Sequence, residues 1–421
     1  MPGPASLRIR ASALYDATGA FAGAPAEIGI QAGRIFFVSR PTSAPPGFGE
    51  EVLDLTRGTV LPGFVDVHAH FTFGTGDRAY ETVMAEDSDE LMVNRGRTNL
   101  ATHLAAGVTT ARDCGARSNT AFELRKIAAG TDVISPRLLV SGPPLTRPRG
   151  HFWYCGGEAG GVDGVEARAS ELIAAGADFL KIMASGGGTV GTDQAESSFS
   201  VAELEALVGV ARSHGLLTAA HCLSAASVDA AVRAGVDQLE HINFIRPDGS
   251  RRMDDRTAER IVSSGVFVSP TIQTGYRLLQ QLRTAAKPDP PASAQMAALE
   301  YKLESKLSFV SRLHEMGAKI VLGTDAIGAM GDYGLGLSLL VQAGLSTTAA
   351  LDAGTRLAAE AIGLGDDVGT VSPGRFADLV VVDGDPILDI NATTQILLVM
   401  REGRIVWQAP DTVRLGGSPP K

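Results

Sequence analysis

Two histidines stand one residue apart at the end of an apolar run, LPGFVDVHAHF, which spans residues 61–71. Residues i and i+2 of a β-strand point to the same side, so a strand here would present the imidazoles of His68 and His70 to one surface. Neutral imidazole is the commonest side-chain ligand for a divalent transition metal. The pair alone is explained equally well by two hydrogen-bonded histidines at a strand end, so further groups of this chemistry are needed to predict a metal site.

Ligand-type or ionisable residues recur in four later apolar segments. A single buried His or Asp is usually structural, but groups that repeat at the same position of successive segments are hard to attribute to chance. The repetition predicts that these segments are strands whose ends meet around one shared site. The residues are Lys181 within DFLKIM, His221 at the end of LLTAAH, His241 at the end of VDQLEH and Asp325 at the end of KIVLGTD.

One local pattern predicts the elements that carry these residues. A helix-like stretch ends in small residues and then a glycine, which suits the left-handed position that terminates a helix. The apolar residues that follow each glycine are typical of a buried parallel strand. With further strands at Leu61–Val67 and Leu138–Ser141, we expect eight strands between about residues 60 and 325. The glycines of the pattern are Gly107, Gly176, Gly215, Gly235, Gly265 and Gly317.

The predicted fold class is α/β, with a closed (β/α)8 TIM barrel as the main domain. Eight βα units over roughly 250 residues match such a barrel in size, and barrel enzymes hold their active site at the carboxyl ends of the strands. A doubly wound open sheet is the alternative. It would more often show a glycine-rich phosphate turn after its first strand, and this sequence has none.

The two ends of the chain have a different pattern from the middle. Residues 5–58 and 371–408 contain short alternating segments separated by turn residues, as in small β-sheets. We therefore predict a composite β-sandwich domain built from residues 1–59 and 369–421, and a barrel domain over residues 60–368. The tail after Pro410 is expected to be frayed.

Composition narrows the class of protein. A net charge of -10 with no basic stretch argues against nucleic-acid binding. Three cysteines in a long chain do not suggest a disulfide framework, which favours a reducing compartment, and we predict a cytoplasmic protein. No signal-peptide core and no run of about 18 apolar residues are present, so no membrane span is predicted. The expected partner is a small-molecule substrate.

The motifs HAH, FLKI, AAHC, EHINF and LGTDA, in this order, resemble the amidohydrolase superfamily of metal-dependent hydrolases. The resemblance extends from about Arg34 to Trp407. It is strongest for the imidazolonepropionase-like branch, which includes prolidase-like and arginine-type dipeptidases and amidases of xenobiotic amides, carbamates or ureas. True imidazolonepropionases and the deaminases of this superfamily use one metal and lack a bridging lysine. Lys181 therefore indicates the two-metal type.

The resemblance implies a centre of two divalent metals, with zinc as the default for a His-rich site and Mn, Co or Fe as alternatives. Lys181 is implied to be carboxylated by carbon dioxide and to bridge the metals; a lysine paired with an acidic neighbour is the alternative. A hydroxide bridging the metals would attack the carbonyl of an amide-type C–N bond, and Asp325 would take the proton and pass it to the leaving nitrogen. One metal would be held by His68, His70 and Asp325, the other by His221 and His241.

Residues for substrate contact are also implied by the resemblance. His151 matches a histidine that helps to hold the carbonyl oxygen in relatives, although a loop histidine without a role is the alternative. Tyr276 lies near the position of a substrate-contacting tyrosine of prolidase-like members, but Gly275 is an extra residue there, which makes Gln273 a rival. Cations for a substrate carboxylate are candidates at Arg147, Arg149 and Arg277.

The predicted function is hydrolysis of an amide-type C–N bond in a dipeptide, an N-acyl amino acid or a xenobiotic amide, carbamate or urea. Hydrolysis of a cyclic amide is the alternative reaction. A non-catalytic scaffold of the same fold is the alternative class, and it is disfavoured because such scaffolds lose ligands whereas this chain keeps all six matched positions. A homo-oligomer is expected from the resemblance alone.

Overall fold

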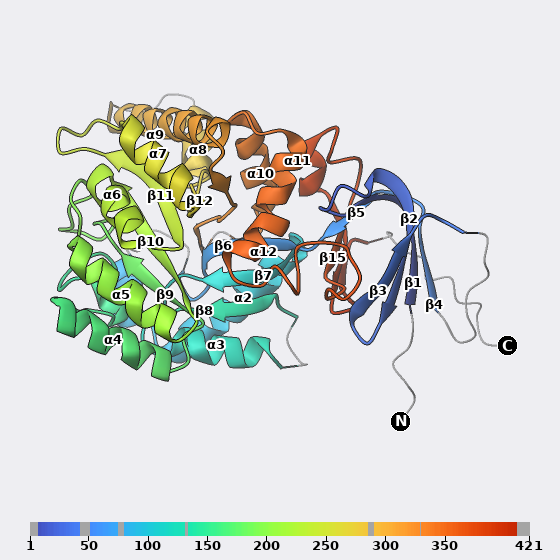
Figure 1. The fold of residues 1–421 in the computed structure, drawn as a ribbon, viewed down its shortest axis with the longest axis horizontal. Helices are drawn as coiled ribbons and strands as arrows, with labels where there is room; N and C mark the ends of the chain where they lie inside the picture. Colours follow the sequence, from blue (N-terminus) through green and yellow to red (C-terminus); the bar gives the residue numbers. More distant parts are fainter. Residues whose placement is uncertain are drawn as a thin grey trace.

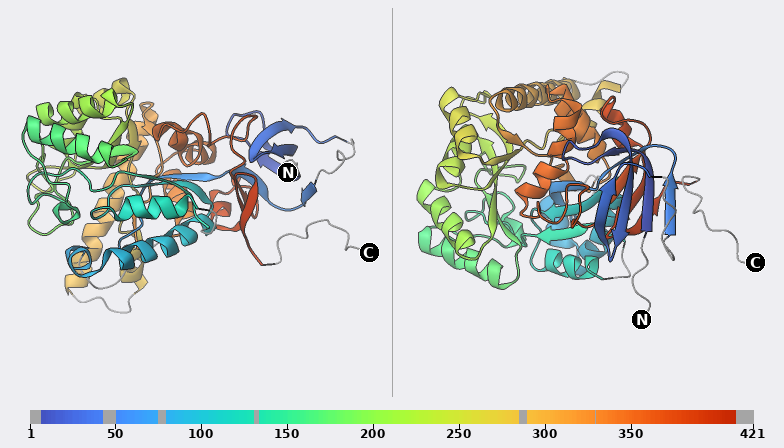
Figure 2. Two further views of the ribbon diagram at one scale, coloured as in Figure 1. Left: turned by 90° about the horizontal axis from the view of Figure 1, so that it is seen from below. Right: turned by 45° about the vertical axis from the view of Figure 1, so that its right-hand side comes forward.

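The computed structural model describes residues 7–42, 51–74, 80–130, 134–284, 290–328 and 330–410. Two regions stand side by side: parallel strands covered by helices, and a separate sheet built from both ends of the chain (Figure 1; Figure 2, left). The α/β class predicted from the sequence is confirmed. The tail predicted to be frayed lies outside the described residues.

The separate sheet, called here the terminal sheet, has eight strands in the order β17-β16-β15-β5-β1-β2-β3, with β4 also paired to β1. The antiparallel pairing of β5 with β15 joins the two ends of the chain. Side chains of its strands, among them Ile28, Val60 and Leu379, form one apolar cluster. The strands are β1 (Leu7–Tyr15), β2 (Ala22–Gln31), β3 (Arg34–Ser39), β4 (Glu51–Leu55), β5 (Thr59–Pro62), β15 (Leu379–Val382), β16 (Ile396–Arg401) and β17 (Arg404–Gln408).

The helix-covered strands form a four-stranded sheet, β14-β6-β7-β8, and a five-stranded sheet, β13-β12-β11-β10-β9. All of their pairings are parallel. Each of the eight strand positions expected between residues 60 and 325 contains an observed strand. The strands are β6 (Phe64–His70), β7 (Val108–Asp113), β8 (Arg137–Val140), β9 (Phe179–Met183), β10 (Leu217–Ser224), β11 (Gln238–Ile245), β12 (Phe267–Ser269), β13 (Lys319–Ile320) and β14 (Ala326–Ile327).

The helices lie on the outer side of these strands (Figure 1). Local capping fixes their ends: Ser200 and Glu203 form a capping box at the start of α5, and Gly235 ends α6 with a left-handed φ of 81°. No described helix is both long enough and apolar enough to cross a bilayer. The helices are α1 (Tyr80–Glu86), α2 (Asp89–Ala105), α3 (Thr120–Ala128), α4 (Val162–Ala174), α5 (Val201–Ser213), α6 (Ala225–Ala234), α7 (Asp255–Ser264), α8 (Tyr276–Thr284), α9 (Pro290–Glu315), α10 (Tyr333–Gln342), α11 (Thr347–Ala353) and α12 (Arg356–Ala361).

The first predicted strand, Leu61–Val67, is divided in the structure. Its beginning belongs to β5 of the terminal sheet, and its remainder belongs to β6 beside β7 and β14. The chain changes sheets at Gly63, where a Cβ atom would lie only 2.1 Å from Oγ1 of Thr109. Only glycine permits this approach, so Gly63 lets the terminal sheet lead directly into the strand that carries His68 and His70.

Candidate active site

The six predicted metal ligands all line one cavity of about 310 Å³. They come from β6, β9, β10 and β11 of the two parallel sheets and from the segment between β13 and β14. His70 is the last residue of β6, and Asp325 follows β13. Parallel strands bring their carboxyl ends to the same edge, which is why residues far apart in the sequence meet here. The complete set is His68, His70, Lys181, His221, His241 and Asp325.

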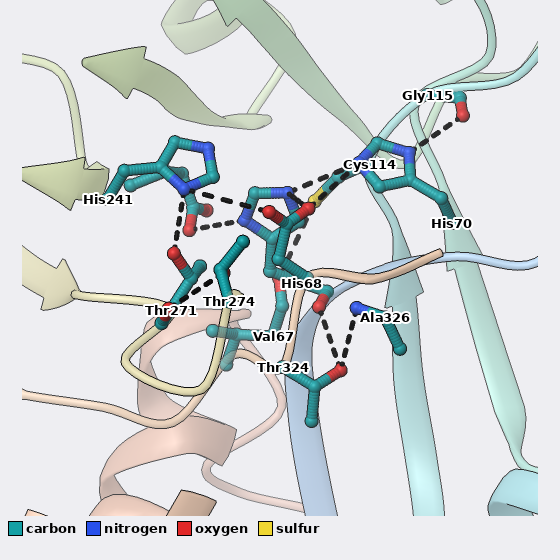
Figure 3. Close-up of polar contacts among 12 residues, drawn as sticks. Val67, His68, His70, Cys114, Gly115, His241, Thr271, Thr274, Thr324 and Ala326 are labelled. Atoms are coloured by element: carbon teal, nitrogen blue, oxygen red, sulfur yellow. Dashed lines mark hydrogen bonds and ion pairs between the residues drawn. The ribbon is translucent and has the colours of Figure 1, made fainter. Parts of the chain in front are cut away.

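His68, His70 and Asp325 form the tightest group in this cavity. Figure 3 shows the two histidine rings of this group. The Nε2 atoms of the two imidazoles are 3.3 Å apart, and Oδ1 of Asp325 is 3.4 Å from the first and 3.5 Å from the second. One ligand atom from each residue lies within 4.8 Å of the others. Two imidazole nitrogens and a carboxylate oxygen that converge in this way fit one divalent cation.

The other ring nitrogens of this histidine pair are already engaged. Nδ1 of His68 lies 2.7 Å from Oε2 of Glu240. Nδ1 of His70 lies 3.0 Å from the carbonyl oxygen of Gly115 (Figure 3). Both partners are acceptors, so each Nδ1 carries the proton and donates it. The Nε2 lone pairs are then left to face the cavity, which is the tautomer that a metal ligand requires.

Glu240 is a site residue that the sequence pattern did not single out. It is fully buried, and its Oε1 atom also accepts a hydrogen bond of 3.2 Å from Nη2 of Arg112. Burial alone would raise the pKa of Glu240, but the electrostatic interactions with His68 and Lys181 and the hydrogen bond from His68 outweigh this effect and lower the pKa to about 2. A glutamate inside an apolar strand, directly before His241, was the available signal for it.

Replacing Glu240 with glutamine is expected to weaken metal binding by about 10- to 100-fold, because the charge that orients the His68 ring is lost. Chelator competition on the purified protein measures this affinity. Asp178→Asn is the matched control, since Asp178 pairs with Arg125 and does not line the cavity. Wild-type affinity in Glu240→Gln would contradict a role for this carboxylate in the metal site.

His221 and His241 form a second pair, with ring centroids 4.4 Å apart. Nε2 of His221 lies 3.1 Å from the carbonyl oxygen of Gly186, and Nδ1 of His241 lies 2.7 Å from Oγ1 of Thr271. Each ring therefore has one nitrogen held by the protein and one free. Burial and neighbouring positive groups lower the pKa of both histidines well below the ordinary value, which keeps them in the neutral form that binds metals.

An unusual backbone conformation brings His241 into the site. Strand alternation would send Glu240 and His241 to opposite faces. Both nevertheless approach His68, the glutamate by its hydrogen bond and His241 with a ring-centroid distance of 5.1 Å. His241 has a φ of 68°, and Asp325 has a φ of 52°. Left-handed backbone is costly for such residues and clusters at functional sites, where the surrounding structure enforces it.

Lys181 lies in the middle of β9 and is 1% exposed. Its Nζ atom has no hydrogen-bond partner in the described part of the chain, and no described acidic residue forms an ion pair with it. A buried amine without a hydrogen-bond partner costs free energy unless another group bonds to it. The donor set therefore fits a metal centre in which a group on this amine takes part.

The three cysteines are free and buried. Cys114 lies close to His68 and Glu240 and forms a second group of ligand-type atoms with them. Burial raises the pKa of the Cys114 thiol to about 12, and the thiol donates a hydrogen bond of 3.6 Å to the carbonyl oxygen of Val67. The Glu240 carboxylate is held by His68 and Arg112. The histidines and Asp325 are therefore the better ligand set.

The model of the amidohydrolase family matches residues 59–406, a range that contains all the cavity residues described above. The chain belongs to the amidohydrolase family. Members of this family generally use divalent metals, which agrees with the group of metal-ligand side chains in the cavity.

Similar proteins include hydrolases of several substrates. Ochratoxinase from Aspergillus niger is 26% identical over 398 residues, covering 85% of this chain and 77% of that protein. An imidazolonepropionase from Agrobacterium fabrum is 23% identical over 400 residues, covering 85% and 84% of the two chains. The crystal structure of a prolidase complexed with N-methylphosphonate-L-proline has a TM-score of 0.82 and 26% identity, covering 96% of this chain and 100% of that chain. Together with the family match, these similarities identify a hydrolase that acts on C–N bonds of small molecules.

His151 of this amidohydrolase lines the same cavity, with its ring centroid 4.6 Å from that of His221. Nδ1 of His151 is 2.8 Å from Oγ1 of Thr189, which fixes the ring. Burial lowers the pKa of His151 to about 3, so the imidazole is neutral at ordinary pH. A neutral ring with a fixed orientation can donate one hydrogen bond to a carbonyl oxygen in the cavity.

The other predicted substrate residues flank the cavity wall and are not among the described residues that line it. Of the segment after β12, Thr274 lines the cavity, whereas Gln273 and Tyr276 are not among the described lining residues. The predicted cations also lie off the cavity in the described structure, and Arg277 pairs with Asp332. The sequence pattern did not single out the cations that do line it, because they stand on a turn and a helix and not at strand ends: Arg251, Lys302 and Lys306.

Proposed function

We propose that this amidohydrolase cleaves an amide-type C–N bond at a centre of two divalent metals. The observation that carries the proposal is the unpartnered Lys181 amine, which interacts electrostatically with His68 of the first pair of histidines and with His221 of the second. A carbamate formed on Lys181 from carbon dioxide would satisfy this amine and provide an oxygen to each metal. The negative charge of the carbamate would also offset the repulsion between two cations.

In this proposal His68, His70 and Asp325 hold one metal, and His221 and His241 hold the other, with zinc as the default. When bound, the metals would lower the pKa of water to about 7 and polarise the substrate carbonyl. The protein positions its own groups for the remaining work. Asp325 lies near both histidine pairs, since its Oδ2 atom is 3.8 Å from Nδ1 of His241.

Two side chains are proposed to act directly on the substrate. The Asp325 carboxylate accepts a proton from the attacking water and passes it to the leaving nitrogen, which is the role of a general base and then a general acid. The neutral His151 ring donates a hydrogen bond to the carbonyl oxygen as negative charge develops there. Both residues line the cavity, which supports their action on one substrate.

The substrate is proposed to be a dipeptide, an N-acyl amino acid or a xenobiotic amide, carbamate or urea. Similarity to ochratoxinase and to a prolidase supports this range. A cyclic amide is the second candidate, and the similarity to an imidazolonepropionase favours it. Lys181 on β9 favours the first group of substrates over a cyclic amide, because a one-metal cyclic amidase would not need a bridging lysine.

We further propose that the two parallel sheets close into a (β/α)8 barrel. Support comes from hydrogen bonds between the sheets: Leu145, after β8, bonds to Lys181 and Met183 of β9 at 2.8 Å each, and Val67 N donates to Leu322 O at 3.3 Å. Residues 60–368 would form the barrel domain, and residues 1–59 and 369–421 a β-sandwich domain. A cytoplasmic location and a homo-oligomer stay predictions from the sequence.

The protein purified without chelator is expected to contain about two divalent metals per chain, because ligand-type groups for two cations converge in the cavity. Elemental analysis gives the number, and a broad screen of amides gives the reaction. Removal of the metals should abolish hydrolysis, and zinc should restore it. A single metal that saturates activity would contradict the two-metal centre, and metal-loaded protein that cleaves none of the amides would contradict the proposed reaction.

A further inference from the structure

Besides Lys181, three cationic side chains line the cavity in the described structure: Arg251, Lys302 and Lys306. Their donors are not equally available. The Lys306 amine is fully used, because it donates to Pro270 O at 2.7 Å, to Thr271 O at 3.0 Å and to Thr271 Oγ1 at 3.2 Å. Arg251 and Lys302 therefore remain as the cations with donors free for a ligand.

Arg251 follows β11 in a turn that is fixed against α9. Its backbone N–H donates to the hydroxyl of Tyr301 at 3.0 Å, and Tyr301 is the residue before Lys302. The turn and the helix thus place both cationic side chains in the wall of the same cavity. Burial lowers the pKa of Lys302, the Asp325 carboxylate raises it, and the positive charge of Arg251 lowers it further, which agrees with this arrangement.

Neither cation has a direct ion-pair partner in the described protein, although the Asp325 carboxylate acts on Lys302 from beyond ion-pair distance. Nη1 of Arg251 is buried without a hydrogen-bond partner, and no described carboxylate forms an ion pair with Arg251 or Lys302. By contrast Arg112, which is fully buried, pairs with Glu240. Leaving two like charges unpaired in a partly buried wall costs free energy, so the arrangement is explained best by an anion that arrives with the ligand.

We propose that Arg251 and Lys302 bind a carboxylate of the substrate. This inference rests on the proposed hydrolysis of an amide bond and narrows its substrate to compounds with a free carboxylate, such as N-acyl amino acids and dipeptides. A neutral arylamide, carbamate or urea would leave both cations unpaired. The planar guanidinium can take a carboxylate through two parallel hydrogen bonds, and the ammonium adds a third donor.

The test compares acids with their neutral counterparts. Metal-loaded protein is assayed with a panel of N-acetyl and N-benzoyl amino acids and with the carboxamide of each. The wild type is expected to prefer the acids. Arg251→Gln should lower kcat/KM for the acids by about 10- to 100-fold and leave the carboxamides within about twofold, which is the range expected when a charge-assisted hydrogen bond is removed.

A second cavity variant and a control variant accompany Arg251→Gln. Lys302→Gln should act in the same direction, and it decides the question if Arg251→Gln fails to fold. Arg252→Gln is the matched control, because Arg252 is exposed, follows Arg251 directly and does not line the cavity. Equal losses on acids and carboxamides in Arg251→Gln and Lys302→Gln, or a wild type that shows no preference for acids, would overturn the carboxylate site.

Measurements of ligand binding distinguish an error in the carboxylate site from an error in the proposed reaction. If no compound is hydrolysed, the proposed function fails, and calorimetric titration of the same panel into metal-loaded protein still tests the site. Acids that bind more tightly than their carboxamides, with the difference lost in Arg251→Gln and kept in Arg252→Gln, support the carboxylate site. A preference for acids that survives in Arg251→Gln and Lys302→Gln would mean that the metals bind the carboxylate, and equal binding of acids and carboxamides would refute the site outright.

Discussion

Lys181→Ala is expected to lose most of its bound metal and to lower turnover by about 100-fold or more. The physical reason is the position of the Lys181 amine, which is buried and unpartnered beside both histidine pairs. Without its carbamate, two cations would lack a shared anionic ligand and would face each other less well neutralised. The loss should exceed the roughly 10- to 100-fold effect typical of residues that only orient a ligand. Elemental analysis and steady-state kinetics measure the two effects.

The control for this variant is Lys319→Ala, which removes an exposed lysine at the start of β13. It should keep both the metal content and the turnover of the wild type. Crystals of the metal-loaded wild type provide an independent measurement, because a carbamate adds three atoms to the lysine amine. An unmodified Lys181 in fully metallated protein would refute the bridging role.

Much of the fold is encoded in local patterns. The glycine at each helix end and the apolar run after it marked the positions of the parallel strands, because helix termination and strand burial are local properties. The division at Gly63 was not predictable in this way. The run from Leu61 to Val67 is apolar except for Asp66, and its two parts are buried in different sheets, so hydrophobicity alone cannot say where the first sheet ends.

The candidate site was predictable to the extent that it depends on strand ends. His68, His221 and Asp325 could be grouped from the sequence because the carboxyl ends of parallel strands meet at one edge of a sheet. Arg251 and Lys302 could not, because their approach depends on how a turn after β11 packs on α9. Candidate cations chosen by proximity to motifs, such as Arg277, turned out to have another partner.

The turn towards the cavity at His241 is a further feature that the sequence does not encode locally. Regular strand geometry would have put Glu240 and His241 on opposite faces, and the left-handed φ of 68° at His241 is imposed by tertiary packing. The position of Glu240 beside His68 therefore does not follow from the sequence pattern. Its role became visible only through its contacts with His68 and Arg112.

Asp325→Asn is expected to lower the turnover number by about 10²- to 10⁴-fold, the usual contribution of a positioned general acid–base group. Asparagine has nearly the same shape and still presents an oxygen near His68 and His70, where Oδ1 of Asp325 lies at 3.4 and 3.5 Å. It cannot accept a proton from water and return it to a leaving nitrogen. Substrate affinity should change far less than turnover, since the cavity wall stays intact.

The measurement must be made on metal-loaded protein, because Asp325 is also a proposed ligand. Equal losses in kcat and in kcat/KM would indicate an interaction made mainly in the transition state. Asp332→Asn is a suitable control, since Asp332 pairs with Arg277 and does not line the cavity. Near wild-type turnover in fully metallated Asp325→Asn would assign the proton transfer to another group, and His151, which is neutral and lines the same cavity, would then be the residue to replace.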